Sequence, residues 1–209
     1  MKKILTLLSS AFIAAGAWAQ NMENGHEYVD LGLTSGTKWA TCNVGASSPE
    51  QYGRYFAWGD VVGQTWNGSS WSRGGFFTTP AHEVDSKWDN LLPEYDAAHV
   101  ILGGEWRMPT AQEISEFIEN TTRTRTTNYN GTGVAGDIFT SKKPGFTDQS
   151  IFLPAAGYGD GTGAPVDRGK YTYYWGSTLS SSTYASGLGP SGYNSDKFYI
   201  GRTIRAVVK

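Results

Sequence analysis

The chain has 209 residues, a formal net charge of −2 at pH 7 and three histidines. Its lysines and arginines are not clustered, which argues against a nucleic-acid partner, because phosphate binding needs basic patches. Cys42 is the only cysteine, so an internal disulfide is excluded.

The first 19 residues predict a secretory signal peptide. Lys2 and Lys3 precede an apolar stretch over 4–15, and Ala17-Trp18-Ala19 is a small-x-small cleavage site. The stretch is short for a bilayer of about 30 Å, so a retained anchor is the less favoured alternative. We expect an exported chain over residues 20–209, forming one domain, at the cell surface, outside the cell or in the periplasm, with no membrane insertion after cleavage.

Two strands are predicted near the start of this domain, over 28–33 and 38–44. Strict alternation in the second strand places Ala40, Cys42 and Val44 on one face. We therefore expect Cys42 to be a buried structural thiol, since nothing in the sequence places a cation or a helix N-terminus beside it.

A first helix is predicted over 49–58, with Ser48 as N-cap, Pro49 at the first helical position and Gly59 as its end. Residues 60–100 are rich in loop formers but carry several Trp and Phe side chains. A loop of this length is expected to be functional, disordered or locally packed, and the aromatic residues favour packing. Tryptophans are expected to supply much of the core, since burying one removes about 150–250 Å² from water.

The clearest helix is predicted over 110–120. Thr110 is its N-cap and Glu113 completes a capping box. Ile114, Phe117 and Ile118 follow at i, i+3 and i+4 and form one apolar stripe. The Thr-rich run 121–127 should not continue the helix, and its two arginines, Arg123 and Arg125, are expected to be solvated.

Short strands are predicted over 151–155, 171–176 and 197–208, separated by Gly- and Ser-rich turns. In the middle strand, Tyr173 and Trp175 share a face opposite Tyr174, so we expect one of those two sets to be buried. The pattern indicates an α+β domain with few helices, a short-stranded sheet and abundant loops.

Seven sequence motifs occur in a fixed order along the chain. They are EYVDLGL, KWATCNVGA, YFAWGD, WRMPT, IFLPAAGY, YYWGST and a terminal R-x-V strand. Over residues 24–208 they resemble the Fibrobacter succinogenes major paralogous domain of exported Bacteroidetes proteins, and through it the C-type-lectin-like superfamily. Two local departures are Thr34, where proline is expected, and Tyr95-Asp96-Ala97-Ala98, where Asp-Asp-Ala-Ala is usual.

This resemblance implies a C-type-lectin-like fold with paired N- and C-terminal strands, two short helices and long loops. Residues 28–44 would pair with 198–208, and the helices would lie at about 49–57 and 110–120. Loops over 60–100 and 157–195 would display the binding surface.

Catalytic and metal-binding patterns are weak, and we expect no enzymatic activity, no metal and no cofactor. There is no Gly-x-Ser-x-Gly elbow, and the C-terminal cysteines of formylglycine-generating enzymes are absent. Paired carboxylates for glycoside cleavage depend on a separation that sequence does not give, so a hydrolase is a disfavoured alternative. Cation binding by loop acids is also disfavoured, because acidic residues are common in solvated turns. The acids concerned are Asp85, Asp89, Glu94, Asp96, Asp160 and Asp167.

The three histidines lack the ligand spacing of a zinc site. His99 lies in an apolar neighbourhood, and we expect it to be a hydrogen-bonded core residue.

A binding surface is predicted in the final third, where tyrosines stand among Ser, Gly and Asn. Antibody loops use this mixture, because Tyr gives contact area at low entropy cost and the small polar residues give adaptable hydrogen bonds. Tyr184 and Tyr193, in turn-rich segments, are favoured over aromatics on strands. The full set of predicted ligand-binding residues is Tyr158, Asp160, Tyr173, Trp175, Tyr184, Tyr193, Asn194 and Asp196.

The expected function is therefore a secreted or surface-exposed, non-enzymatic module that recognises a glycan or a surface protein. Two alternatives are a variable target protein of a diversity-generating retroelement and a structural subunit of the cell envelope. The sequence predicts no oligomeric state.

Overall fold

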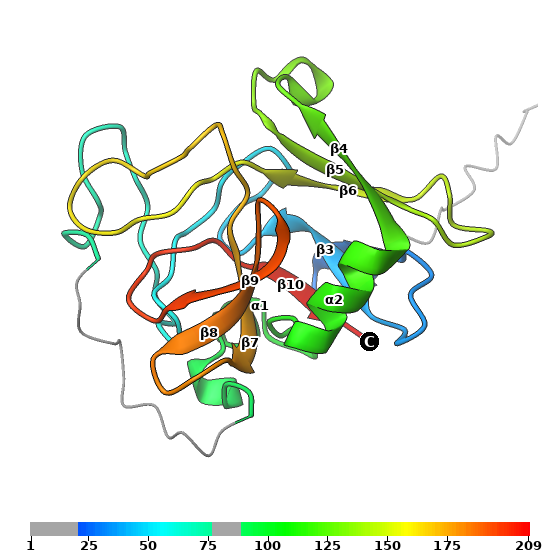
Figure 1. Ribbon diagram of the computed structural model, residues 1–209, viewed down its shortest axis with the longest axis horizontal. Coiled ribbons are helices and arrows are strands. Elements are labelled where there is room, and N and C mark those ends of the chain that lie inside the picture. The colour runs from blue at the N-terminus through cyan, green and yellow to red at the C-terminus, as the bar shows by residue number, and fades with distance from the viewer. Residues whose placement is uncertain (1–20, 77–88) are drawn as a thin grey trace, which may run out of the picture.

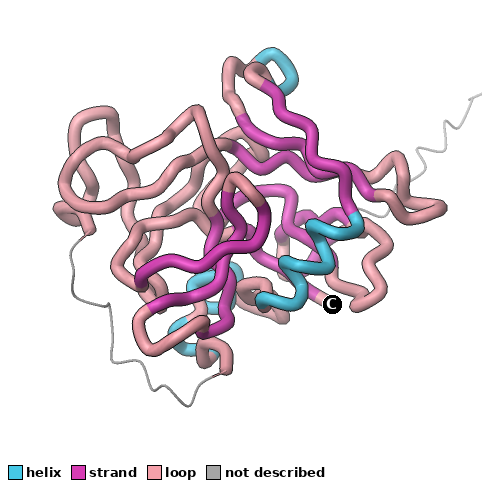
Figure 2. The backbone as a smooth tube through the Cα atoms, in the orientation of Figure 1, coloured by secondary structure: helices cyan, strands magenta, loops and turns pink. Residues whose placement is uncertain are grey.

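The computed structural model describes residues 21–76 and 89–209. This part of the chain is mostly β, with two short α-helices and three antiparallel sheets, and loops fill much of the space between them (Figure 2). The predicted signal peptide lies outside the described residues, as do His82, Asp85 and Trp88.

The first sheet joins the two ends of the domain. Its strands are β1 (Met22–Glu23), β2 (His26–Val29), β3 (Lys38–Asn43) and β10 (Arg205–Val208), in that order. β10 runs antiparallel to β3, with Val207 opposite Trp39. The predicted pairing of the terminal strands is confirmed for β3. The predicted strand over 28–33 ends at Val29. After it the chain bends, because Gly32 has φ +66° and its N–H donates to Asp30 Oδ1.

Arg205 fastens β10 to its neighbours. The side chain is 1% exposed, and its Nε donates to Asn43 Oδ1 at 2.9 Å. Its two Nη atoms donate to the carbonyls of Ala40, Thr41 and Phe152. One guanidinium therefore links β10 to β3 and to the second sheet.

The prediction of a helix over 49–58 is wrong. This segment is a series of turns and bridges, with Gly53 at φ +72°. The amides of Tyr55, Phe56 and Trp58 donate to distant carbonyls rather than to residues four positions back. Long-range pairing thus overrides a good local start signal.

The first α-helix is instead α1 (Ala97–Leu102), which follows the 3₁₀ turn η1 (Pro93–Tyr95). The Asp96 side chain accepts from the amides of Ala98 and His99 and so caps α1, which ends at Gly103. Asp96 also accepts from Met108 N at 2.8 Å. This carboxylate is therefore occupied by backbone donors. His99 is hydrogen-bonded as expected, with Nδ1 3.2 Å from the Trp106 carbonyl, but it is half-buried.

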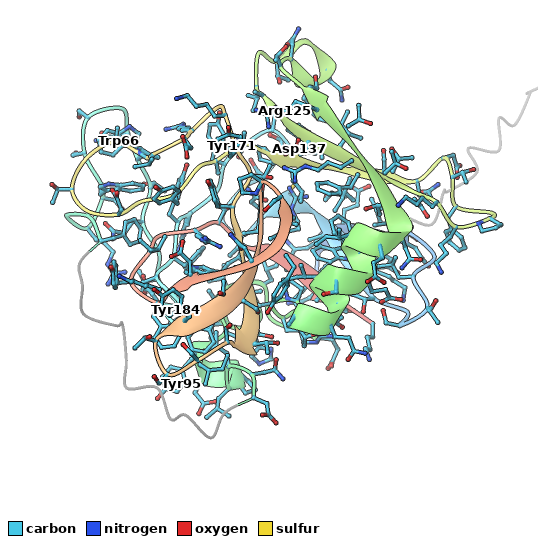
Figure 3. The ribbon with its side chains drawn as sticks, viewed as in Figure 1. Trp66, Tyr95, Arg125, Asp137, Tyr171 and Tyr184 are labelled. Carbon is cyan, nitrogen blue, oxygen red and sulfur yellow. The ribbon has the colours of Figure 1, made fainter. Side chains whose placement is uncertain are left out.

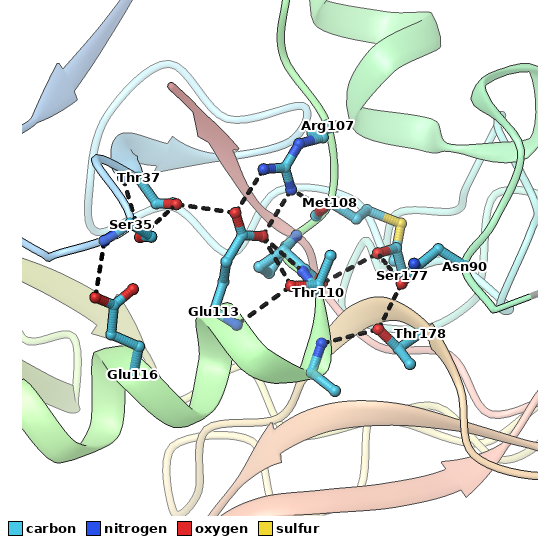
Figure 4. A network of polar contacts seen from close by, with 12 residues as sticks. Ser35, Thr37, Asn90, Arg107, Met108, Thr110, Glu113, Glu116, Ser177 and Thr178 are labelled. Atoms are coloured by element: carbon cyan, nitrogen blue, oxygen red, sulfur yellow. Dashed lines mark hydrogen bonds and ion pairs between the residues drawn. The ribbon is translucent and has the colours of Figure 1, made fainter.

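The predicted helix at 110–120 is confirmed as α2 (Ala111–Asn120), with both bonds of the Thr110–Glu113 capping box. Ile114 and Phe117 are buried, as the stripe predicts. Glu113 also accepts from Arg107 and from Thr37, so it ties α2 to the loop before it and to the residues preceding β3 (Figure 4).

The second sheet consists of β4 (Thr121–Thr126), β5 (Gly136–Ser141) and β6 (Ser150–Pro154), with the 3₁₀ turn η2 (Tyr129–Gly131) between β4 and β5. It rises from the end of α2 (Figure 1). The expectation that Arg123 is solvated is wrong. Its guanidinium bonds Asp137 at 2.8 Å and reaches the Gly189 and Pro190 carbonyls. Arg123 therefore connects β4 to the turn at 189–190.

The third sheet contains β7 (Tyr174–Leu179), β8 (Tyr184–Gly189) and β9 (Gly192–Lys197), and α2 packs on one face of it (Figure 1). Tyr174 and Trp175 are both buried although they point to opposite faces. The expected buried set is found at Tyr174, but Trp175 of the other set is buried as well, so core residues cover both faces of this strand.

Aromatic side chains supply much of the core, as predicted. Trp39 packs on Phe117 with ring centroids 4.3 Å apart. The described part of the long loop is also packed locally, since Trp71 contacts the rings of Tyr55, Trp66 and Phe76 at 5.0–5.3 Å. Among the described residues, the fully buried tryptophans are Trp39, Trp58, Trp106 and Trp175. No helix within 21–76 and 89–209 has the length and hydropathy to cross a membrane.

Candidate ligand-binding site

Four of the predicted binding residues meet around Arg202, which the sequence reading did not single out. Arg202 lies between β9 and β10 and is 1% exposed. Its Nη2 bonds Asp196 Oδ2 at 2.5 Å, and its Nη1 bonds Asn194 Oδ1 at 3.1 Å. The guanidinium carbon lies 5.2 Å from the ring centroid of Tyr173 and 4.7 Å from that of Trp175. A buried cation is thus held between two aromatic rings and two polar side chains.

Three tyrosines form the outer part of this site. The rings of Tyr158 and Tyr173 meet edge to face, with centroids 5.1 Å apart and an interplanar angle of 79°. Tyr171 stands at 84° to Tyr173, at 6.5 Å. Tyr158 and Tyr173 are half-buried, whereas Tyr171 is 46% exposed. We call Tyr158, Tyr171, Tyr173, Asn194, Asp196 and Arg202 the Arg202 cluster.

Backbone pairing between distant segments holds the cluster in place. Gly159 and Gly201 exchange two hydrogen bonds at 2.7–2.8 Å, and Phe56 and Arg202 exchange two at 2.8–2.9 Å. Trp175 N donates to the Thr203 carbonyl at 3.0 Å. The 201–203 segment is therefore fixed on three sides by residues from separate parts of the chain.

Glycine is required where these segments approach each other. A Cβ on Gly201 would lie 2.3 Å from the Phe76 ring, and one on Gly157 would lie 2.0 Å from the Val166 carbonyl. Gly157 also has φ +65°, a conformation that other residues rarely adopt. These glycines let Tyr158 enter the cluster on a tight turn.

Strand alternation determines which residues of β9 reach Arg202. Asn194 and Asp196 share one face of β9, and Asn194 lies opposite Gly187 of β8. A Cβ on Gly187 would lie 2.8 Å from Arg202 Nη1. The missing side chain at 187 therefore leaves the space that the guanidinium fills.

Burial and charge shape the acid–base behaviour of the site. Burial lowers the pKa of Arg202, and the Asp196 carboxylate opposes that shift. Burial raises the pKa of Tyr158, and the charges of Asp160, Asp167 and Asp196 raise it further. The pKa of Tyr173 is raised in the same way, by burial first and then by Asp167. Both phenols therefore stay protonated at neutral pH and can donate hydrogen bonds.

The predicted residues divide into three groups. Tyr158, Tyr173, Asn194 and Asp196 are brought together, with the exposed side chain of Asp160 two residues beyond Tyr158. Trp175 is 0% exposed, and its Nε1 donates to the Phe56 carbonyl. Its prediction as a contact residue is therefore corrected, because its ring is part of the core.

Tyr184 and Tyr193 belong elsewhere. Tyr193 alternates with Asn194 and so points away from Arg202, and it is 46% exposed. Tyr184 lies opposite Lys197 on that same face of the sheet. Figure 3 shows Tyr184 well separated from Tyr171. The two tyrosines favoured from sequence thus do not join the Arg202 cluster.

Two other candidates for reactive chemistry were considered from the sequence, the thiol of Cys42 and groups of metal-binding side chains. Cys42 is half-buried, not buried as predicted, because it borders a hollow of about 410 Å³ beside the β1–β2 hairpin. Within the described ranges, no three His, Cys, Asp or Glu side chains are grouped so as to hold a metal ion.

No protein-family model, curated protein or solved structure matches this chain.

Proposed function

We propose that this protein is an exported, non-enzymatic binding module that recognises a glycan, or a surface protein, through the Arg202 cluster. We assign it to the Fibrobacter succinogenes major paralogous type of the C-type-lectin-like superfamily. The seven ordered motifs support that assignment, together with the antiparallel pairing of β3 with β10, two short helices and long loops.

The observation that carries the proposal is the convergence of side chains from three separate segments at the surface. Residues 158–160, 171–173 and 194–196 approach a single buried guanidinium, and the backbone bonds of 201–203 fix their positions. A site built in advance of binding loses little conformational entropy when a ligand arrives. Half-exposed tyrosine rings offer both an apolar face for a sugar ring and a hydroxyl donor.

The polar groups of the cluster favour binding over catalysis. Asp196 is bound to Arg202 at 2.5 Å, and the Asp167 carboxylate lies 3.5 Å from the Tyr173 hydroxyl. A general acid or base needs a carboxylate or imidazole that is free to exchange a proton with the substrate. These carboxylates instead hold other side chains in position.

A glycan and mucin array probed with residues 20–209 tests the proposal. We expect hits that are lost in Tyr173→Ala and kept in Tyr193→Ala, because only Tyr173 belongs to the cluster. Circular dichroism of both variants checks that the fold is retained. Hits that persist in Tyr173→Ala would place the site elsewhere. An empty array, with a stoichiometric envelope partner crosslinked in native cells, would favour the structural-subunit alternative.

A further inference from the structure

Three asparagines of this chain are followed directly by glycine. They are Asn24, Asn67 and Asn130, and all three residues are exposed. An asparagine in this context can lose its amide, because the next backbone nitrogen can attack the side-chain carbonyl carbon and close a five-membered ring. Glycine favours the attack, since it has no Cβ to hinder the approach and its backbone rotates freely. The dipeptide is the same at all three sites, so the fold decides which of them reacts first.

The side chain of Asn24 is bonded and packed. Its Nδ2 donates to the Leu102 carbonyl, at the end of α1, at 2.6 Å. A Cβ on Gly104 would lie 2.9 Å from Asn24 Cβ, so the space on that side is filled. Ring closure moves the side-chain amide towards the Gly25 nitrogen, and it therefore breaks the bond to Leu102.

The side chain of Asn67 closes its own turn. Its Oδ1 accepts from the amides of Ser69 and Ser70 at 2.9 and 2.8 Å, and from the Ser69 hydroxyl at 3.0 Å. Its Nδ2 donates to Ser70 Oγ at 3.3 Å. Ring closure at Asn67 turns the amide away from these partners, so it breaks several bonds at once.

Asn130 has a backbone conformation like that of Asn24 but an unbonded side chain. The angle φ is +47° at Asn130 and +44° at Asn24. Asn130 and Gly131 lie in an exposed turn at the tip of the β4–β5 hairpin, closed by a 2.9 Å bond from Thr132 N to the Tyr129 carbonyl (Figure 1). Within the part of the chain that the structure describes, nothing bonds the Asn130 side-chain amide. Ring closure here therefore breaks no side-chain hydrogen bond among these residues.

We propose that Asn130 is the site at which this protein deamidates first. The Gly131 nitrogen bonds to Asn130 Cγ and loses its proton, and the side-chain nitrogen leaves as ammonia. Water then opens the succinimide ring at either carbonyl, and the products are aspartate and isoaspartate. Either product adds a negative charge to the tip of the hairpin at neutral pH. This proposal does not depend on the proposed function.

Peptide mapping by mass spectrometry tests the proposal on the folded 20–209 protein, incubated at mildly alkaline pH. The replacement of the amide NH₂ by OH is followed at each of the three asparagines. We expect Asn130 to react about two- to tenfold faster than Asn24, whose one side-chain bond must break first. Its lead over Asn67 should be larger, because more bonds are broken there.

The same protein in guanidinium chloride is the matched control. Each asparagine still precedes glycine there, but no fold restrains its side chain, so the lead of Asn130 should disappear. Asn130→Asp is a second control. Aspartate tolerates the left-handed conformation at this position but has no amide to lose. The fast phase of ammonia release should therefore be absent from this variant.

Three results would overturn the proposal. The first is deamidation of Asn24 or Asn67 in the folded protein at the rate of Asn130 or faster. The second is a lead of Asn130 that is equally large in denaturant, because the fold would then not be its cause. The third is a fast phase of ammonia release that persists in Asn130→Asp.

Discussion

Three arginine side chains of this protein lie in different surroundings, and each has a different structural consequence. Arg123 pairs with Asp137 at 2.8 Å, and Arg202 pairs with Asp196 at 2.5 Å. Arg205 is bonded by Asn43 and three backbone carbonyls, and no carboxylate pairs with it among the ion pairs of the described residues. The planar guanidinium group of arginine has five N–H donors and can bond several acceptors at once. The ammonium group of lysine cannot do so in the same geometry.

Arg205→Lys should therefore destabilise the protein strongly. Lysine keeps the charge but loses the fork, so buried carbonyls and Asn43 lose their donors. We expect a loss of about 3 kcal/mol in the free energy of unfolding, measured by urea denaturation. Arg125→Lys is the control, because Arg125 is exposed and has only a 3.5 Å contact with Asp137 and one hydrogen bond to the Gly169 carbonyl within the described residues. Equal midpoints for the two variants would show that the Arg205 bonds are dispensable.

The stability of the protein depends on pH through Glu113. Burial raises its pKa, but the hydrogen bonds and charge of Arg107, with bonds from Thr110 and Thr37, outweigh burial and bring the pKa to about 2. A carboxylate whose pKa is lowered on folding stabilises the protein above its unfolded pKa of about 4.5, and that contribution disappears as pH falls towards 2.

We expect Glu113→Gln to lose up to about 3 kcal/mol relative to the unaltered protein at pH 7, and progressively less below pH 4.5. Urea midpoints measured between pH 7 and pH 2.5 give this difference directly. A stability difference that stays constant over that range would mean that the Arg107–Glu113 pair contributes through packing and not through charge.

At the scale of elements, local signals predicted α2 well and the segment 49–58 badly. The Thr110–Glu113 capping box and the stripe at Ile114 and Phe117 are local and mutually consistent. Ser48 and Pro49 are an equally good local start, but the amides that follow bond to residues far away in the chain. Helix α1 also has local start and end signals, although no helix is predicted there from the sequence. They are Asp96 as N-cap before two alanines, and Gly103 after the helix.

Gly187→Ala should damage the third sheet and the Arg202 cluster together. An added Cβ would lie 2.4 Å from the Tyr174 carbonyl and 2.8 Å from Arg202 Nη1. Overpacking of this kind costs about 1–3 kcal/mol, which lowers the melting temperature by several degrees. Gly161→Ala is the control, because a Cβ there meets nothing within 4 Å. If both variants melt at the temperature of the unaltered protein, the sheet accommodates the methyl group and the packing argument is wrong.

At the scale of the whole molecule, the sequence predicted the closure of the domain but only part of the site. Pairing of the terminal strands is what the family resemblance implies, and it is found between β3 and β10. Tyr158, Tyr173, Asn194 and Asp196 could be selected by composition, because Tyr and Asn in Gly-rich turns favour binding surfaces. Arg202 could not, since the bonds of 201–203 to residues 56, 159 and 175 leave no local pattern. Composition also could not tell which face of β9 turns inwards.

The central claim is that the Arg202 cluster, and not the opposite face of β9, is where this protein meets its ligand. An amide NMR titration of residues 20–209 with O-glycans released from mucin tests it most directly. Our account predicts that the shifted signals gather at 158–160, 171–173, 194–196 and 202. Shifts centred on Tyr184 and Tyr193, with the cluster unchanged, would contradict it.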